Sequence, residues 1–113
     1  MARAVRIPAR FEIGVSLPQD KTASLKGYHC WAFAAVDGSW LPMDISEAWK
    51  HKTNKDAYFG QLDEHRITLS TGRDIILEPK QKQGPLNYFV YPYAEVDGQK
   101  HIVKHLFSIS PAQ

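Results

Sequence analysis

Hydrophobic and polar residues alternate along residues 10–17, RFEIGVSL, near the start of the chain. Phe11, Ile13 and Val15 occupy every second position, with Arg10, Glu12 and Gly14 between them. Successive side chains of a strand point to opposite faces, so this pattern is typical of a half-buried β-strand. The residues before it, MARAVR (1–6), favour a short helix that the following Ile7-Pro8 step ends.

The strongest hairpin signal lies in residues 27–46, GYHCWAFAAVDGSWLPMDIS. Asp37-Gly38 has strand-forming residues on both sides, which predicts a two-residue turn between antiparallel strands. The numbers of cross-strand partners then sum to 75, so Ala35 faces Trp40, Phe33 faces Pro42, Trp31 faces Asp44 and His29 faces Ser46. This register makes His29 and Asp44 diagonal neighbours on one face of the hairpin.

The pairing of His29 with Asp44 gives this hairpin its candidate chemistry. Diagonal neighbours lie roughly 7 Å apart at the backbone, within reach of an imidazole–carboxylate hydrogen bond. A carboxylate on one ring nitrogen fixes the tautomer and stabilises the imidazolium, while the other nitrogen faces the substrate. Cys30 follows His29 directly in the strand and is expected on the opposite face. A solvated or structural His–Asp pair is the alternative interpretation.

The rest of the chain predicts one helix and two more hairpins, with exposed loops at residues 18–26 and 78–85. Residues 45–52, ISEAWKHK, predict a short helix with Ser46 as its N-cap. Residues 66–77 predict a hairpin that turns near Thr71-Gly72 with Ile67, Leu69, Ile75 and Leu77 facing inward. Residues 87–109 predict a hairpin that turns at Asp97-Gly98, with partner numbers summing to 195 and apolar residues on both faces. This last hairpin is therefore expected to be packed on both sides.

Length and composition predict one globular domain over residues 1–113, with 43% hydrophobic and 23% charged residues. The predicted fold class is α+β, a mainly antiparallel β-sheet of several hairpins with short helices. The net charge of +2 arises from scattered basic residues, so we expect no nucleic-acid partner. No apolar run is long enough to cross a bilayer and the N-terminus lacks the apolar core of a signal peptide, so we expect no membrane partner and a cytoplasmic location.

Metal and cofactor chemistry has little support in the sequence. The chain has one cysteine, which excludes an intrachain disulfide and a cysteine-based zinc site within it. His101 and His105 have the spacing of a helical metal pair, but they lie in a strand-like segment, where residues four apart are about 13 Å apart. We therefore expect no metal and no cofactor.

Several runs of the chain together resemble the transglutaminase-like superfamily, bacterial branch, a papain-like fold that uses Cys, His and Asp. These runs are ARAVRIPARFEIGVSLP, GYHCWAF, SWLPMDISEA, YFGQLDEHRITLSTGRDIILEP and GPLNYFVYPYAEVDG, which cover nearly the whole chain. The resemblance implies that His29 is the catalytic histidine and Asp44 the third triad member. It matches Cys30 to a non-catalytic cysteine and places the nucleophile upstream of the Ala-Arg-Ala segment, so the chain is expected to be the C-terminal half of the core without its nucleophile helix.

Three functions follow from this resemblance as expectations. The first is a cysteine hydrolase or acyltransferase fragment, inactive alone, whose complete form acts on amide bonds of peptides or proteins, with Trp31 and Trp40 as candidates to line the substrate cleft. The second is a non-catalytic interaction module, in which a second copy or another partner chain covers the site of the missing helix. The third recruits Cys30 as nucleophile through a changed register. Arg66, Arg73 and Asp74 also match the family pattern, which would allow pairing near the cleft edge, but we expect them to form structural salt bridges instead.

Overall fold

A computed structural model of the chain describes residues 2–18, 23–25 and 27–110. In chain order its elements are η1 (Ala2–Val5), β1 (Ala9–Ser16), β2 (Ala23–Ser24), β3 (His29–Val36), β4 (Ser39–Met43), α1 (Ile45–Lys50), η2 (Lys52–Tyr58), β5 (Arg66–Thr71), β6 (Ala94–Val96), β7 (Gln99–His101) and β8 (Ser108–Ile109). The short η elements are 3₁₀ helices. Antiparallel strands with few short helices confirm the predicted α+β class.

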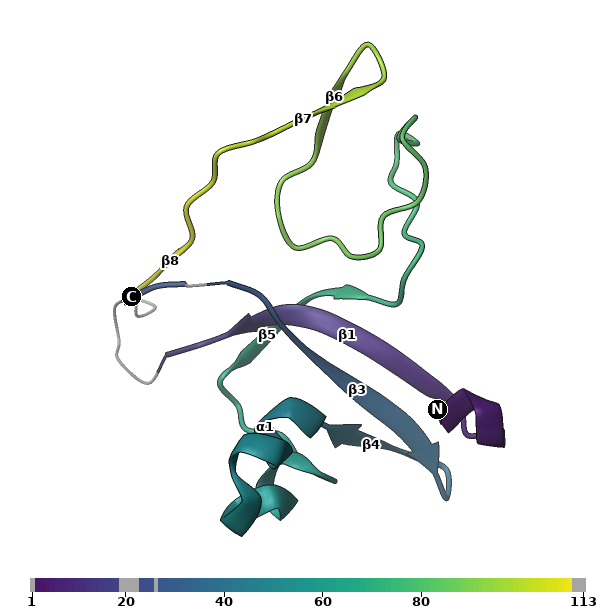
Figure 1. Cartoon of the computed structure of the whole chain (residues 1–113), viewed down its shortest axis with the longest axis vertical. Helices are drawn as coiled ribbons and strands as arrows, with labels where there is room; N and C mark the ends of the chain where they lie inside the picture. Colours follow the sequence, from purple (N-terminus) through teal and green to yellow (C-terminus); the bar gives the residue numbers. More distant parts are fainter. Residues whose placement is uncertain (1, 19–22, 26, 111–113) are drawn as a thin grey trace.

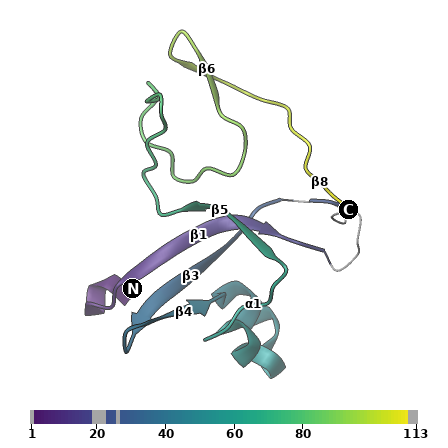
Figure 2. The ribbon, with the colours of Figure 1, turned by 180° about the vertical axis from the view of Figure 1, so that it is seen from behind.

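A four-stranded antiparallel sheet with the order β4-β3-β1-β5 forms the centre of the structure (Figure 1). The two long strands β1 and β3 lie side by side, and α1 and η2 follow β4 at one side of the sheet. The chain after β5 lies on the other side, as the view from behind also shows (Figure 2). No helix of the described residues has the length and apolar character needed to cross a membrane.

The β3–β4 hairpin has the predicted register. Ala35 pairs with Trp40 and Phe33 with Pro42, around a turn at Asp37 and Gly38. Both turn residues have positive φ, 48° and 79°, which is the conformation of the type I′ turn that suits the twist of a hairpin. The turn chemistry read from two residues therefore fixes the register of the whole hairpin.

The alternation of side chains gives this sheet two different faces. The His29 face carries Arg10, Glu12, His29, Trp31 and Phe33, whereas the Cys30 face carries Phe11, Ile13, Val15, Cys30 and Ala34. Both faces contain buried groups, because Trp31 and Glu12 are buried on one face and Ile13 and Val15 on the other. The Cys30 face is apolar, and the His29 face combines aromatic rings with charged groups.

The predicted hairpin at residues 66–77 is wrong, because β5 pairs with β1 and has no partner strand in the residues that follow it. The chain does turn at Gly72, whose N–H donates to the carbonyl of Phe11 at 2.7 Å. Ile67 and Leu69, predicted to face inward, are 46% and 43% exposed. The free edge of β1 provides the backbone partners that a local hairpin was expected to provide, so the pairing is long-range.

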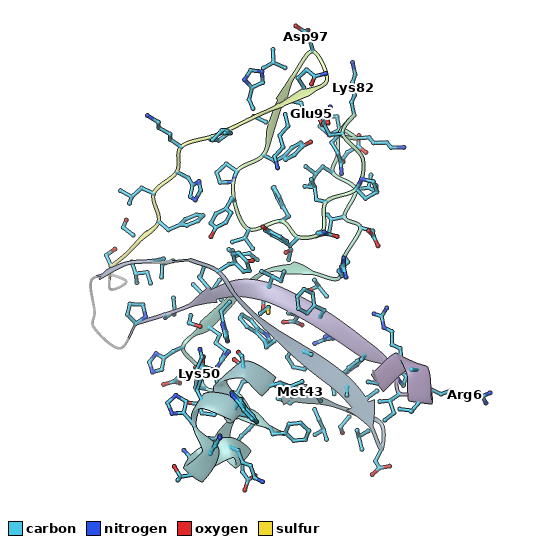
Figure 3. The ribbon with its side chains drawn as sticks, viewed as in Figure 1. Arg6, Met43, Lys50, Lys82, Glu95 and Asp97 are labelled. Carbon is cyan, nitrogen blue, oxygen red and sulfur yellow. The ribbon has the colours of Figure 1, made fainter. Side chains whose placement is uncertain are left out.

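The last hairpin is correct in register but shorter than predicted. β6 and β7 pair Glu95 with Lys100 around the turn at Asp97 and Gly98, as a two-stranded sheet of their own. The Glu95 carboxylate accepts hydrogen bonds from the backbone N–H groups of Lys82 and Gln83. Glu95 and Lys82 are labelled near the turn at Asp97 in Figure 3.

The prediction that this hairpin is packed on both faces is also wrong. Beyond β7 the side chains of Ile102 and Leu106 are 96% and 84% exposed. Pro92, just before β6, has no N–H to donate to a ladder, which shortens the hairpin.

The predictions of a short N-terminal helix and of a loop at residues 18–26 are met in part. Ala2–Val5 form a single 3₁₀ helix, while Met1 lies outside the described residues. Within the predicted loop at residues 18–26, Ala23–Ser24 form the short strand β2, which pairs with β8. Residues 19–22 and 26 of that loop also lie outside the described residues.

Candidate functional site

The structure brings His29 and Asp44 together at the end of the β3–β4 hairpin. His29 is the first residue of β3, and Asp44 lies between β4 and α1. Nε2 of His29 is 2.5 Å from Oδ2 of Asp44. The Asp44 side chain is fully buried, whereas 21% of the His29 side chain remains exposed. A carboxylate accepts hydrogen bonds, so Nε2 carries the proton and Nδ1 is the free ring nitrogen.

Asp44 accepts hydrogen bonds on both carboxylate oxygens. Oδ2 accepts from His29 and from Nη1 of Arg66, at 2.5 and 2.6 Å. Oδ1 accepts from the hydroxyl of Ser46 and from the backbone N–H of Glu47, at 2.8 and 3.0 Å. Asp44, and not the predicted Ser46, is therefore the N-cap of α1. The helix begins at Ile45, so Asp44 is in the N-cap position, and its carboxylate both caps the helix and bonds His29 of β3.

These partners decide the protonation state of Asp44. Burial alone raises the pKa of Asp44, but hydrogen bonds from Glu47 N–H, His29, Ser46 and Arg66 outweigh it and lower the pKa to about 2. Asp44 is therefore a carboxylate at neutral pH and throughout the range in which a histidine titrates.

This low pKa predicts an acid-sensitive contribution to stability. The folded pKa of about 2 lies below the ordinary value of 3.8, so the contribution is complete above about pH 5 and is lost as the pH falls through about 2. We expect the free energy of unfolding to lose about 2 kcal/mol over this range from Asp44 alone. Urea unfolding between pH 6 and 2 measures it. Asp44→Asn should lack this part of the loss, whereas Asp56→Asn, which changes an exposed aspartate, should retain it. An equal loss of stability on acidification in the wild type and both variants would contradict the prediction.

Arg66 is the ion-pair partner of Asp44. Its side chain is 8% exposed, and its second guanidinium nitrogen, Nη2, bonds Oδ2 of Asp63 at 3.0 Å. Burial lowers the pKa of Arg66, but the hydrogen bonds to the two aspartates more than offset this and raise it. The predicted salt bridge of Arg66 is thus present and includes the candidate catalytic aspartate. By contrast, Arg73 bonds the Asn87 side chain.

The two tryptophans named as cleft candidates lie in different environments on the His29 face. Trp31 is 4% exposed, and its indole N–H donates to Glu12 at 3.2 Å. Trp40 is 45% exposed, with the Arg10 guanidinium 4.8 Å from its ring centre. Trp31 therefore belongs to the buried support of the pair, whereas Trp40 offers an accessible ring. Their contact with a substrate stays a prediction.

Cys30 lies on the face opposite His29, because the β3–β4 register is the one expected from Asp37-Gly38. It lines a cavity of about 250 Å³ together with Phe11, Ile13, Tyr28, Arg73, Asn87 and Tyr88. Burial, with a smaller effect of the Asp44 charge, raises the pKa of the Cys30 thiol. The changed register that would make Cys30 the nucleophile is absent from this hairpin, and the raised pKa disfavours the reactive thiolate.

A second cavity, of about 310 Å³, lies beside the Asp44–Arg66 ion pair. Its lining consists of Ser16, Leu17, Glu47, Tyr58, Asp63, His65 and Arg66. The Glu47 carboxylate bonds Lys50 of the same helix and lies 3.4 Å from the ring of His51. Across residues 2–18, 23–25 and 27–110, no three His, Cys, Asp or Glu side chains are grouped as metal ligands would be.

Glu12 is a buried group of the site that sequence reasoning missed. It is 7% exposed and accepts hydrogen bonds from Trp31 and from the hydroxyl of Thr68. Its place in an alternating strand marked it as a polar residue on the exposed side of β1. The signal that could have found it is the neighbouring Arg10, whose Nε lies 3.0 Å from the Glu12 carboxylate.

Comparison with known proteins agrees with the resemblance seen in the sequence. Residues 1–45 match the sequence model of the Transglutaminase-like superfamily. A curated relative from Haemophilus influenzae, named "Uncharacterized protein", is 28% identical over 130 aligned residues, which include 87% of this chain and 35% of the relative. The chain thus spans about a third of the length of that relative. No solved structure matches this chain.

Proposed function

We propose that this chain is part of a transglutaminase-like cysteine hydrolase or acyltransferase that acts on amide bonds of peptides or proteins. His29 is the general base and acid, Asp44 orients it, and the thiol nucleophile comes from outside these 113 residues. The observation that supports this proposal most is the 2.5 Å bond from His29 to the fully buried carboxylate of Asp44. Both residues also lie within the 45 residues that match the superfamily.

The geometry suits a thiol that approaches Nδ1 of His29. Asp44 accepts a hydrogen bond from the N–H at Nε2, so the Nδ1 lone pair is free to take the proton of a cysteine S–H. The thiolate then attacks the carbonyl carbon of the amide, and the imidazolium returns the proton to the leaving amine. A thioester remains on the cysteine. Water or a second amine cleaves it, with Nδ1 again taking a proton. The negative charge of Asp44 stabilises the imidazolium in both halves of this reaction.

The test begins with the genomic DNA upstream of the codon for Met1. We expect an in-frame Gly-x-Cys-x-Asp there, and a longer protein that includes it should carry a reactive cysteine. At pH 6 a thiolate stabilised by His29 is on the order of a hundredfold more abundant than that of an ordinary thiol. Iodoacetamide should therefore alkylate the upstream cysteine far faster than Cys30, with the two sites separated by mass spectrometry.

Variants of the longer protein decide the role of His29. His29→Ala should remove the fast alkylation and lower amide hydrolysis by at least about a hundredfold. His101→Ala changes an exposed histidine of β7 and should leave both rates unchanged. The proposal fails if no upstream or partner cysteine exists, or if the cysteine reacts equally fast without His29.

A second candidate function, a non-catalytic module that self-associates, is favoured by apolar side chains on β4 and α1. Leu41, Ile45 and Trp49 are 38%, 66% and 72% exposed. β4 is also an edge strand; Pro42 and Met43 already bond residues 59 and 60, so only its first residues, 39–41, can pair with a second copy of the chain. Sedimentation velocity across micromolar concentrations should then show a dimer that Leu41→Lys dissociates. A monomer at every concentration would rule this candidate out.

A further inference from the structure

Arg66 and His29 share one oxygen of Asp44. Nη1 of Arg66 lies 2.6 Å from Oδ2, and Nε2 of His29 lies 2.5 Å from the same atom. Arg66 is the first residue of β5 and is separated from Asp44 by 22 positions in the sequence. An arginine that bonds the same oxygen as the imidazole affects both the charge and the orientation available to that imidazole.

The guanidinium of Arg66 is held on more than one side. Nη2 bonds Asp63, and the guanidinium carbon lies 5.3 Å from the centre of the Trp31 ring, a cation–π contact. Trp31 is in turn held through its indole N–H by Glu12. The position of Arg66 is therefore fixed by the sheet, and a planar fork of this kind cannot be reproduced by a lysine.

A buried carboxylate needs a compensating positive charge. If His29 were the only cationic partner of Asp44, the resting pair would be favoured as an imidazolium and a carboxylate, with both ring nitrogens protonated. Arg66 supplies that charge permanently, because a guanidinium is not deprotonated in proteins. The imidazole can then remain neutral with Nδ1 unprotonated, which is the form that accepts a thiol proton.

We propose that Arg66 is a positioning residue for the His29–Asp44 pair, which it keeps in the form with Nε2 protonated and Nδ1 free. This inference rests on the proposed catalytic role of the pair. The competing account is a purely structural one, in which Arg66 only ties β5 to the end of the β3–β4 hairpin. That account predicts a loss of stability on substitution without any change in the His29 imidazole.

Nitrogen-15 NMR of the imidazoles in the full chain at neutral pH separates the two accounts. In the wild-type chain we expect His29 with Nε2 protonated and Nδ1 unprotonated. In Arg66→Gln the Nδ1 resonance should move to the position of a protonated nitrogen. Arg73→Gln removes an arginine that bonds Asn87, away from the pair, and should leave the His29 resonances unchanged. A wild-type His29 protonated on both nitrogens would overturn the proposal, as would an unchanged Nδ1 resonance in a folded Arg66→Gln chain.

Arg66→Lys keeps the charge and provides the test if the glutamine variant does not fold. An ammonium group lacks the planar fork that bonds Asp44 and Asp63 together. We expect Nδ1 to stay unprotonated while the Nε2 proton exchanges with water several-fold faster, and an unchanged exchange rate would contradict positioning. In the longer protein, slow alkylation of the upstream cysteine with wild-type Arg66 would refute the proposed function alone. The imidazole spectra would still decide the role of Arg66.

Discussion

Replacing Asp44 by alanine is expected to lower the free energy of unfolding by about 4–6 kcal/mol at neutral pH. The substitution leaves the buried guanidinium of Arg66 without its 2.6 Å partner, and breaking a buried ion pair in this way costs about 3–5 kcal/mol. It also removes the N-cap of α1, which contributes about 1 kcal/mol. Domains of this kind are typically stable by about 5–15 kcal/mol, so the variant should lose a large part of its stability.

Guanidinium chloride unfolding followed by far-ultraviolet circular dichroism measures this loss. Asp44→Asn is the matched variant, because its side-chain oxygen can still accept from the Glu47 N–H while the negative charge is gone. We expect the asparagine variant to recover the capping part of the loss and no more. A total loss under about 1 kcal/mol in the alanine variant is the size seen for exposed ion pairs, and it would show that the Asp44 network does not stabilise the fold.

The local part of the fold was predictable because its information lies within a few residues. Asp37-Gly38 and Asp97-Gly98 both determine turns in which each residue has positive φ, and each turn then fixes its hairpin register. The proximity of His29 and Asp44 follows from the first of these registers. For the same reason the sequence placed Cys30 on the opposite face of β3.

The long-range part was not predictable from these patterns. Residues 66–71 have the character of a strand, but nothing in them indicates that β1, over 50 residues earlier, is their partner. Arg66 reaches Asp44 only because β5 pairs with β1, so its bond to the candidate catalytic aspartate could not be foreseen. The N-cap of α1 was ambiguous, since Asp44 and Ser46 are both good capping residues and only the observed start at Ile45 separates them.

Among the glycines of the described residues, Gly14 is expected to be the one least able to accept a side chain. β1 and β5 approach so closely there that a Cβ atom on residue 14 would lie 1.8 Å from the carbonyl oxygen of Ile67. The pairing of β1 with β5 shifts register between Ile13 and Gly14, which marks a bulge at this point. Because the obstacle is backbone, Gly14→Ala must push the strands apart, and we expect a loss of about 3 kcal/mol or more in the free energy of unfolding.

Gly27→Ala is the matched control, since a Cβ atom there meets nothing within 4 Å and residue 27 precedes the sheet. Chemical denaturation of this variant should match the wild type within about 0.5 kcal/mol. The strand that Gly14→Ala displaces is the one that begins with Arg66, so the His29 imidazole spectrum should change in the same sense as in Arg66→Gln. If the alanine variant keeps wild-type stability and spectrum, the close approach of β1 and β5 is not what brings Arg66 to Asp44.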